Sequence, residues 1–393
     1  MISVEEARNI IAAHSSRLAP VKKSIPESAG QILAKDVFAF ADIPSFRQSS
    51  MDGYAIIFAD RNKSLQLSGT MMAGSSSSIN LQKGNAVRIF TGAPLPDGAD
   101  TVVMQEKVIK KGDAITVEDS DLTEGKNVRN KGAEIKSGDL AMREGTLLTP
   151  AAIGFLSGIG ISEVYVYPSP SISIVITGNE IQEPGVALEF GQVYDANSFQ
   201  LKAALQSIGI TNINTWKVND NPDALKKVLD QALERSDMVL LTGGVSVGDY
   251  DFVVQATSAC NVTQHFHKIK QRPGKPLFFG TRVKKPVFGL PGNPSSVLSC
   301  FYMYVVPCIS LLSGRDNRVK SSNAVLADNY NKPKGLTCFL KGFEKDGTVT
   351  ALGAQESFRL SSFAQANCLV ELEEARESYE AGESVTIHLL TFS

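Results

Sequence analysis

The spacing of apolar residues changes several times along the chain, and near the N-terminus it predicts a helix. Between Ala7 and Leu18 apolar positions recur every three or four residues, which is typical of an amphipathic helix over residues 4–18. Ser3 and Glu6 match a capping box, in which both side chains satisfy free amides at a helix start. This part is therefore expected to form a short capped helix.

Residues 45–148 have short apolar runs separated by Gly, Ser, Asp and Asn. The runs 86–90, 101–104 and 114–117 are typical of strands joined by tight turns. The C-terminal part shows the same character, with expected strands at 324–327, 338–341, 368–372 and 385–390. It predicts a small β-barrel or sandwich, in which the acidic segment 371–380 is interpreted as a solvated hairpin without a function.

From about Pro168 onward, strand-like and helix-like segments alternate. We expect a strand at 171–176, a helix at 198–208, a strand at 213–218, a helix at 221–236, and strands at 238–241, 277–279 and 287–288. This order predicts a mostly parallel sheet with helices on both faces, which is a three-layer α/β domain.

A long stretch from 287 to 313 carries no charge. A membrane helix needs about 20 predominantly apolar residues. Here Pro291 and Pro294 interrupt the front of the stretch, and Pro307 lies within its most apolar part. We therefore predict a buried helix of the α/β core, and no membrane partner.

Composition and charge narrow the class of protein. A chain of 393 residues is expected to form two to four domains. Lys and Arg number 39 against 41 Asp and Glu, so the net charge is −2, which argues against a nucleic-acid partner or an anionic membrane. The hydrophobic share of 43% is that of a globular protein with several cores.

The five cysteines have no C-x-x-C spacing, and the four histidines are scattered. This pattern argues against a zinc site and against a disulfide framework. The N-terminus has no basic start followed by an apolar core, so no signal peptide is expected. The expected compartment is the reducing cytoplasm.

Loops rich in turn formers follow three of the expected strands, at 177–180, 242–251 and 289–294. In an open parallel sheet, ligands bind beyond the carboxyl ends of the strands. Glycines let backbone amides approach a ligand, and a following helix start favours an anion. Asn293 and Pro294 supply such a start ahead of the apolar helix, so a phosphate site is expected there.

Acidic residues accompany these loops, at Glu180, Asp220, Asp249 and Asp251. Carboxylates beside a phosphate are what Mg²⁺ needs, because they supply oxygen ligands while the substrate supplies the rest. The turn from Arg272 to Lys275 adds two cations suited to a polyanion.

An alternative interpretation takes the Gly244–Gly248 segment as the nucleophile elbow of a hydrolase. Ser246 would be its nucleophile, with an acid and one of the histidines His265, His267 and His388. The elbow should continue directly into a helix, whereas an Asp-Tyr-Asp segment follows here. Asp52 and Thr91 are expected in ordinary loops, and the local sequence alone assigns neither residue a catalytic role.

Together these motifs resemble one family, the molybdopterin molybdenumtransferases of the MoeA type, which are related to the C-terminal part of gephyrin. The segments that carry the resemblance are Ser50-Met-Asp-Gly-Tyr-Ala, Phe90-Thr-Gly-Ala-Pro-Leu-Pro-Asp-Gly-Ala-Asp, Asn127-Val-Arg, Thr177-Gly-Asn-Glu, Thr242-Gly-Gly-Val-Ser-Val-Gly, Arg272-Pro-Gly-Lys-Pro and Gly289-Leu-Pro-Gly-Asn-Pro. They occur in the family's order and cover nearly the whole chain.

The resemblance implies a homodimer whose subunit has four parts. These are a split linker and dimerisation domain at 1–44 and 138–167, a β-rich inserted domain at 45–137, an α/β molybdopterin-binding domain at 168–315 and a C-terminal β-barrel at 316–393. The implied reaction inserts molybdenum from molybdate into adenylylated molybdopterin and releases AMP, with Mg²⁺ as the cofactor. An adenylyltransferase that acts one step earlier is the implied source of the substrate.

The family's functional positions are carried over onto this chain residue by residue. Glu180, Asp220 and Asp251 would place Mg²⁺, and Asp52, Thr91 and Arg129 would join the catalytic group where a partner subunit closes a cleft. The expected ligand-binding residues are Gly243, Gly244, Ser246, Gly248, Arg272, Lys275, Pro291, Gly292, Asn293 and Pro294.

Three positions depart from the family pattern. Arg47 replaces an acid before the Met-Asp-Gly-Tyr motif, Glu134 stands where the family has Asp, and Asn179 stands where it often has Asp. Two other functions remain open at this point. One is a molybdopterin adenylyltransferase, which usually has Thr-Gly-Gly-Thr-Gly where this chain has Thr-Gly-Gly-Val-Ser. The other is a non-catalytic binding or scaffold module.

Overall fold

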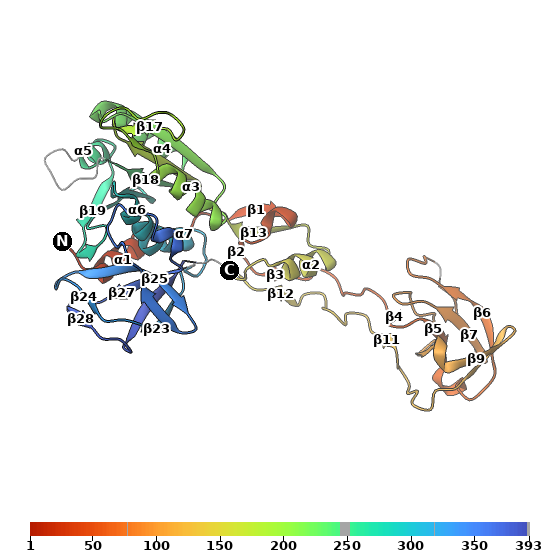
Figure 1. Cartoon of the computed structure of the whole chain (residues 1–393). Coiled ribbons are helices and arrows are strands. Elements are labelled where there is room, and N and C mark those ends of the chain that lie inside the picture. The colour runs from red at the N-terminus through yellow and green to blue at the C-terminus, as the bar shows by residue number, and fades with distance from the viewer. Residues whose placement is uncertain (77, 244–251, 318, 391–393) are drawn as a thin grey trace. The chain divides into compact units, whose positions relative to one another are not determined.

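The computed structural model describes residues 1–76, 78–243, 252–317 and 319–390. The chain forms two compact units, which are treated separately below. The first, unit 1, contains residues 1–21 and 166–393, and the second, unit 2, contains residues 22–165 (Figure 1). The four-part division expected from the sequence stays a prediction.

Unit 1 starts with helix α1 (Val4–Ala13), which has the expected capping box. The backbone N–H of Glu6 donates to Ser3 Oγ at 3.1 Å, and the N–H of Ser3 donates to Glu6 Oε2 at 2.7 Å. The expected end at residue 18 is wrong, because the helix stops before Ser15 and Ser16. Serine side chains compete with the helical hydrogen bonds of the backbone.

The central sheet of unit 1 has six strands in the order β17-β14-β18-β22-β21-β19. Its parallel part consists of β17 (Ile213–Val218), β14 (Ile172–Thr177), β18 (Met238–Thr242) and β22 (Lys285–Leu290). Its antiparallel part adds β21 (Pro276–Arg282) and β19 (Thr263–Lys268). The prediction of a mostly parallel sheet is confirmed, although β19 was not expected.

Helices cover both faces of this sheet (Figure 1). On one face Ile174 of β14 shares a core with Leu201 of α3 (Asn197–Ser207). On the other face its neighbour Val175 shares a core with α4 (Pro222–Arg235) and α5 (Phe252–Ala259). Successive strand residues point to opposite faces, so a continuous apolar strand needs cover on both.

The long apolar helix runs from Pro294 to Leu312, and 78% of its most apolar 18-residue segment is buried. It consists of α6 (Pro294–Cys300), a π-helical turn (Phe301–Val305) and α7 (Val306–Leu312). Pro307 lacks an N–H and crowds the preceding turn, which accounts for the wider turn before it. The predicted core helix is confirmed.

The C-terminal part of unit 1 is a closed barrel. Its five strands are β25 (Thr337–Lys345), β26 (Thr348–Ala351), β23 (Ser321–Leu326), β29 (Ser384–Leu389) and β27 (Cys368–Leu372), and pairing of β25 with β27 closes it. Short pairings are added to it by β20 (Gln271–Arg272) on β25 and by β24 (Tyr330–Asn331) on β28 (Ser378–Tyr379). Elsewhere in unit 1, after β14, the strand β15 (Ile181–Gln182) pairs with β16 (Val193–Tyr194). Of the two predicted forms, barrel and sandwich, the barrel is correct.

The expectation of a solvated acidic hairpin at 371–380 is wrong for Glu371. This residue lies on β27, and its side chain is only 21% exposed. Arg8 of α1 donates to both of its carboxylate oxygens, at 2.9 and 3.3 Å, and Nε2 of His388 lies 2.6 Å from Oε2. Glu371 therefore ties the N-terminal helix to the barrel.

Unit 2 is rich in strands, as predicted. Its largest sheet has the order β8-β5-β7-β6-β10-β9, formed by β5 (Gly53–Ile56), β6 (Leu65–Met71), β7 (Asn85–Ile89), β8 (Thr101–Met104), β9 (Val108–Lys111) and β10 (Ala114–Val117). The smaller elements are β2 (Ile32–Leu33), β3 (Val37–Phe38), β4 (Gln48–Ser49), β11 (Val128–Arg129), β12 (Leu140–Met142) and the helix α2 (Pro150–Gly158). The strands β1 (Val21–Ser24) and β13 (Glu163–Tyr167) begin or end in unit 1 and lie mostly in unit 2.

Candidate active site

The parallel strands bring two of the predicted acids to the same edge of the sheet. Thr177 at the end of β14 is in register with Val218 at the end of β17, and Glu180 and Asp220 follow within three residues. The two loops also touch, because the backbone N–H of Asp220 donates to Asn179 Oδ1 at 3.2 Å. The ligand-binding edge of an open parallel sheet therefore carries both acids.

Asp220 has an oxygen without a partner among the described residues. Its Oδ1 is buried and accepts no hydrogen bond from them, and the same is true of the hydroxyl of Thr177, which is paired in the sheet with Val218, two residues before Asp220. A buried polar atom left unsatisfied is costly, and such atoms mark places where a ligand or ion completes the structure. Asp251, the third predicted acid, lies outside the described residues. Within them, no group of three His, Cys, Asp or Glu side chains could hold a metal.

Gly243 is the one residue of the glycine-rich loop that the structure describes, since Gly244, Ser246 and Gly248 lie outside the described residues. Its φ is +87°, and a Cβ placed on it would lie 2.0 Å from the carbonyl oxygen of Thr177. Only glycine can pass the end of β14 this closely. The loop therefore leaves β18 beside the acids of the sheet edge.

One cavity of unit 1, of about 630 Å³, is lined by the predicted cations and by the loop at 289–294 with the predicted phosphate site, called the phosphate loop below. Arg272 and Lys275 line it together with Pro291, Gly292 and Asn293. Both cationic side chains are exposed, and neither forms an ion pair with a described residue. Residues 355–358, which follow strand β26 of the barrel, also line it. This cavity can receive an anionic ligand.

Several polar side chains hold the phosphate loop in place, and sequence reasoning did not single out those of α3. Asn197 Nδ2 donates to the carbonyl of Gly292 and to the hydroxyl of Thr242, both at 2.9 Å. Gln200 Nε2 donates to the carbonyl of Pro294 at 3.0 Å. The sequence did contain a signal for these two residues, since Asn197 and Gln200 are amide side chains about one helical turn apart near the start of a predicted helix.

Asp52 and Thr91 lie in unit 2 and contact each other. Thr91 donates to Asp52 Oδ1 from its backbone N–H at 2.8 Å and from its hydroxyl at 2.7 Å. These two hydrogen bonds stabilise the carboxylate and lower the pKa of Asp52 below its ordinary value. The pair is thus a prearranged anionic group.

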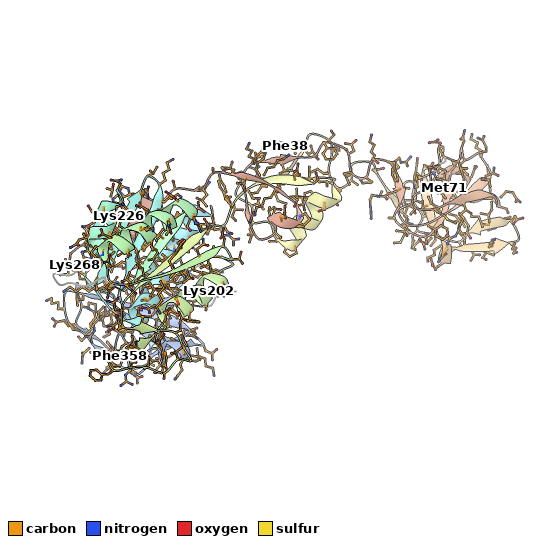
Figure 2. All side chains as sticks on the ribbon, turned by 90° about the horizontal axis from the view of Figure 1, so that it is seen from above. Phe38, Met71, Lys202, Lys226, Lys268 and Phe358 are labelled. Carbon is orange, nitrogen blue, oxygen red and sulfur yellow. The ribbon has the colours of Figure 1, made fainter. Side chains whose placement is uncertain are left out.

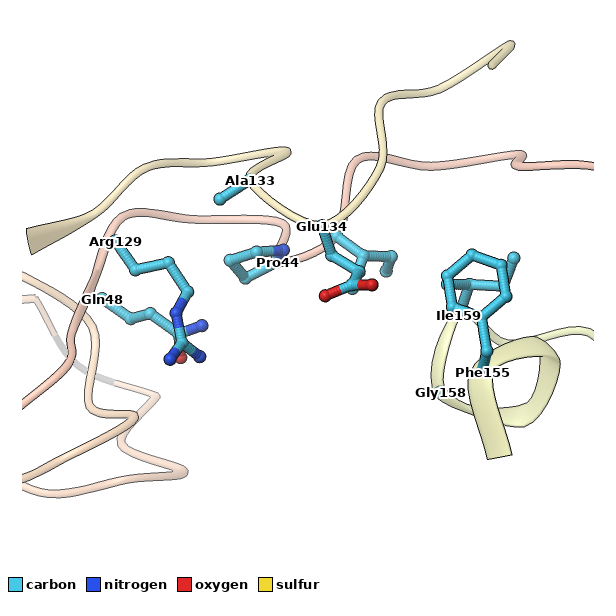
Figure 3. Close-up of a pocket in the computed structure, with 9 residues that line it drawn as sticks. Pro44, Gln48, Arg129, Ala133, Glu134, Phe155, Gly158 and Ile159 are labelled. Carbon is cyan, nitrogen blue, oxygen red and sulfur yellow. The ribbon is translucent and has the colours of Figure 1, made fainter. Parts of the chain in front are cut away.

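Arg129 lies in a separate cavity of unit 2, of about 590 Å³, which Asp52 and Thr91 do not line. Glu134 lines it as well, and Figure 3 shows this carboxylate and the Arg129 guanidinium directed into the same space, with Pro44 between them. The departure from the family pattern at Glu134 therefore falls inside a cavity. The departure at Arg47 lies on the surface, where Nη1 donates to the carbonyl of Ala99 at 3.4 Å.

The hydrolase alternative gains no support from the histidines. His265 stacks on His14 with ring centroids 3.7 Å apart, and its Nε2 lies 2.9 Å from the hydroxyl of Thr281. His388 contacts Glu371 in the barrel. His267 packs edge-on against Phe278. Ser246 lies outside the described residues.

This fold and these loops define a class, that of proteins with a molybdopterin-binding α/β domain. The model described as "Probable molybdopterin binding domain" matches residues 173–310. The "MoeA N-terminal region (domain I and II)" matches residues 2–160, and the "MoeA C-terminal region (domain IV)" matches residues 323–390.

Relatives of known name match the whole length. The molybdopterin molybdenumtransferase of Haemophilus influenzae is 37% identical over 384 residues, which is 93% of this chain and 94% of the relative. The Staphylococcus aureus protein of the same name is 31% identical and covers 99% and 95%. A crystal structure of a molybdopterin biosynthesis MoeA protein from Pyrococcus horikoshii superposes with a TM-score of 0.85, at 29% identity and 99% coverage of each chain. The chain belongs to the MoeA family of molybdopterin molybdenumtransferases, and the resemblance noted in the sequence is confirmed.

Proposed function

We propose that this protein inserts molybdenum from molybdate into adenylylated molybdopterin and releases AMP. Membership of the family makes it a transferase of molybdenum cofactor biosynthesis that acts on a molybdopterin-type substrate. The observation that carries the proposal is the cavity that Arg272 and Lys275 line together with Gly292 and Asn293. Two exposed cations in one cavity with the loop at 289–294 suit a substrate with several phosphate charges and an oxyanion as second reactant.

Mg²⁺ is proposed as the cofactor, and the chemistry of Asp220 supports this. The buried, unpartnered Oδ1 of Asp220 is the kind of hard oxygen ligand that this ion prefers. Glu180 follows the neighbouring strand, and Asp251 is the third proposed ligand. When bound there, the ion would neutralise phosphate charge and orient the phosphoanhydride.

The remaining roles belong to the side chains themselves. Arg272 and Lys275 would hold phosphate or molybdate, and Gly243 would let the loop backbone approach the pterin phosphate. Asn197 and Gln200 keep the phosphate loop fixed, so that its backbone is already arranged when the substrate arrives.

A homodimer is part of this proposal. Each unit exposes large apolar side chains, among them Phe38, Phe40 and Leu147 in unit 2 and Leu188, Phe190 and Phe199 in unit 1. Figure 2 labels Phe38, which is 55% exposed. A contiguous exposed apolar patch is typical of a surface that meets another chain, and Phe38 and Phe40 are two exposed apolar residues close together in the sequence. In the dimer, Asp52, Thr91 and Arg129 would serve the same reaction.

The proposed setting is the cytoplasm, where a molybdopterin adenylyltransferase would deliver the substrate. Delivery by a second enzyme would spare a reactive dithiolene from release into solvent. Light scattering on mixtures of the two enzymes would test this association, and absence of a complex in the presence of substrate would contradict it.

The function can be tested with purified protein, adenylylated molybdopterin, molybdate and Mg²⁺. We expect AMP release that depends on molybdate, together with a product that activates an apo-molybdoenzyme. Asp220→Asn and Glu180→Gln should each lower the rate at least tenfold and raise the Mg²⁺ requirement, because each removes a negative ligand. Asp223→Asn is the matched control, since Asp223 is exposed at the start of α4.

The same preparation separates the alternatives. Consumption of ATP with unmodified molybdopterin would identify an adenylyltransferase. Binding of molybdopterin or AMP in equilibrium dialysis without any turnover would identify a binding module. Either result would overturn the proposed reaction.

A further inference from the structure

Lys341 is buried to an unusual degree for a lysine. It lies on strand β25 of the barrel, and only 2% of its surface is exposed. Lysine is among the residues least often buried completely, because its charge loses the solvation of water. No described carboxylate forms an ion pair with it, and burial lowers its pKa below the ordinary value.

Three backbone carbonyls take the place of water around this ammonium group. Nζ donates to the carbonyl oxygens of Ala354 at 2.7 Å, Arg359 at 3.1 Å and Glu356 at 3.4 Å. A lysine ammonium has three donors, and here all three are used. The three acceptors belong to one irregular segment of the barrel, residues 352–362, which we call the barrel loop.

The backbone of Lys341 is fixed to the same loop. Its N–H donates to Gln355 Oε1 at 3.0 Å, and Gln355 Nε2 donates to the carbonyl of Lys341 at 2.9 Å. Ala354 has a φ of +55°, which is unfavourable for a residue with a Cβ. Its carbonyl accepts from both Lys341 and the hydroxyl of Ser362, so two donors hold the unfavourable turn.

The other side of the barrel loop reaches the cavity of the active site. Glu356, Ser357 and Phe358 line this cavity, and Phe358 protrudes from the surface of unit 1 (Figure 2). Ser357 contacts the phosphate loop twice. Its hydroxyl accepts from Asn293 Nδ2 at 2.7 Å, and its carbonyl accepts from the backbone N–H of Ser295 at 3.0 Å.

We infer that Lys341 is a positioning residue of the active site, which holds the barrel loop so that Ser357 fixes the phosphate loop at Asn293. The inference rests on the proposed function, because it assigns the phosphate loop to substrate binding. Lys341 itself is buried and is not among the residues that line the cavity. Its influence passes through the loop carbonyls and Ser357.

The test compares Lys341→Met with a control that destabilises the same barrel elsewhere. Methionine keeps the length of the side chain but removes the ammonium donor from all three carbonyls, of which Ala354 still accepts from Ser362 and Glu356 from the N–H of Arg359. Ile387→Ala removes a buried side chain of β29 whose hydrophobic cluster includes no described residue of the barrel loop. Both variants are assayed well below their melting temperatures. We expect Lys341→Met to raise KM for adenylylated molybdopterin at least about fivefold, with a smaller change in kcat, and Ile387→Ala to leave KM unchanged.

Hydrogen exchange provides a readout that does not depend on turnover. Lys341→Met should speed amide exchange in residues 352–362 and also in the phosphate loop at 289–296, whereas a purely local role would affect the barrel loop alone. Ser362→Ala removes only the second donor to Ala354, and should produce the same changes in weaker form where Lys341→Met fails to fold.

The outcomes separate the two proposals. An unmodified enzyme without molybdate-dependent AMP release defeats the proposed function, and exchange at 289–296 then decides the inference. An active enzyme whose KM and phosphate-loop exchange are unchanged in Lys341→Met and Ser362→Ala defeats the inference alone. If Ile387→Ala changed KM and phosphate-loop exchange as much as Lys341→Met does, the inference would also be wrong, because Lys341 would then contribute only to the general stability of the barrel.

Discussion

Thr91 donates two hydrogen bonds to a single oxygen of Asp52, one from its backbone and one from its hydroxyl. The two residues come from different loops of unit 2, and the sequence motifs named each of them separately. Their contact makes them one hydrogen-bonded pair, in which Thr91 orients the carboxylate and lowers the pKa of Asp52.

This contact predicts that substitutions at the two positions are not additive. Thr91→Val removes the hydroxyl donor but keeps the backbone N–H, and should lower the rate of AMP release at least about tenfold, the size expected for one hydrogen bond to a charged group. Asp52→Asn should cost more, and the double variant should resemble Asp52→Asn. Steady-state kinetics of the four proteins measure the coupling. Thr70→Val, at an exposed position of the same unit, is the control, and additive losses would show that the two side chains act independently.

Asn197 should matter for substrate binding although it lies outside every recognisable motif. Asn197→Ala removes the donors to Gly292 and Thr242 and frees the phosphate loop. We expect KM to rise about tenfold, with a melting temperature lowered by only a few degrees. Asn212→Ala, on an exposed loop before β17, should change neither quantity. An unchanged KM in Asn197→Ala would mean that the loop keeps its shape without this side chain.

Gly243 predicts a difference between two glycines that share a left-handed backbone. Gly347 has a φ of +80° with open space around it, so Gly347→Ala should cost only the conformational penalty of about 1 kcal/mol. Gly243→Ala adds a clash with the Thr177 carbonyl and should lower the free energy of unfolding by clearly more. Urea denaturation of both variants measures the difference. Equal losses of stability would mean that a Cβ at position 243 does not clash with the Thr177 carbonyl.

Glu371 predicts a specific loss of stability in acid. Burial alone would raise its pKa, but hydrogen bonds from His388 and Arg8 outweigh this and lower the pKa from 4.5 to about 2. The resulting stabilisation, ~3 kcal/mol, is complete above pH 4.5 and is lost as the pH falls toward 2. Denaturation curves between pH 3 and 7 should therefore depend less on pH in Glu371→Gln than in the unmodified protein. Glu234→Gln, at an exposed position of α4, should retain the original dependence.

Local patterns in the sequence predicted most of the elements that form the sheet and its cover. β14, β17 and β18 are short β-branched or apolar runs, and α4 has a clear apolar face, so their periodicity alone identified them. The strand β19 escaped this reasoning, because its sequence, Thr-Gln-His-Phe-His-Lys, alternates polar with aromatic and histidine residues and resembles a surface segment. β19 is the outermost strand on one side of the sheet, and its less buried face explains that composition.

The residues of the candidate site also fall into two groups, those that the sequence predicted and those that only the tertiary structure identified. The sequence by itself determined the residues that must be glycine, proline, acid or base at the strand ends, because tight turns and charged ligands demand particular residue types. Only the tertiary structure decided which distant side chains support them: Asn197 beneath Gly292, Ser357 against Asn293, and Lys341 within the barrel loop. A hydrogen bond between residues far apart in the chain leaves no periodic trace, since each partner alone resembles an ordinary surface residue. The fold places the two partners together and removes the water that would otherwise satisfy them.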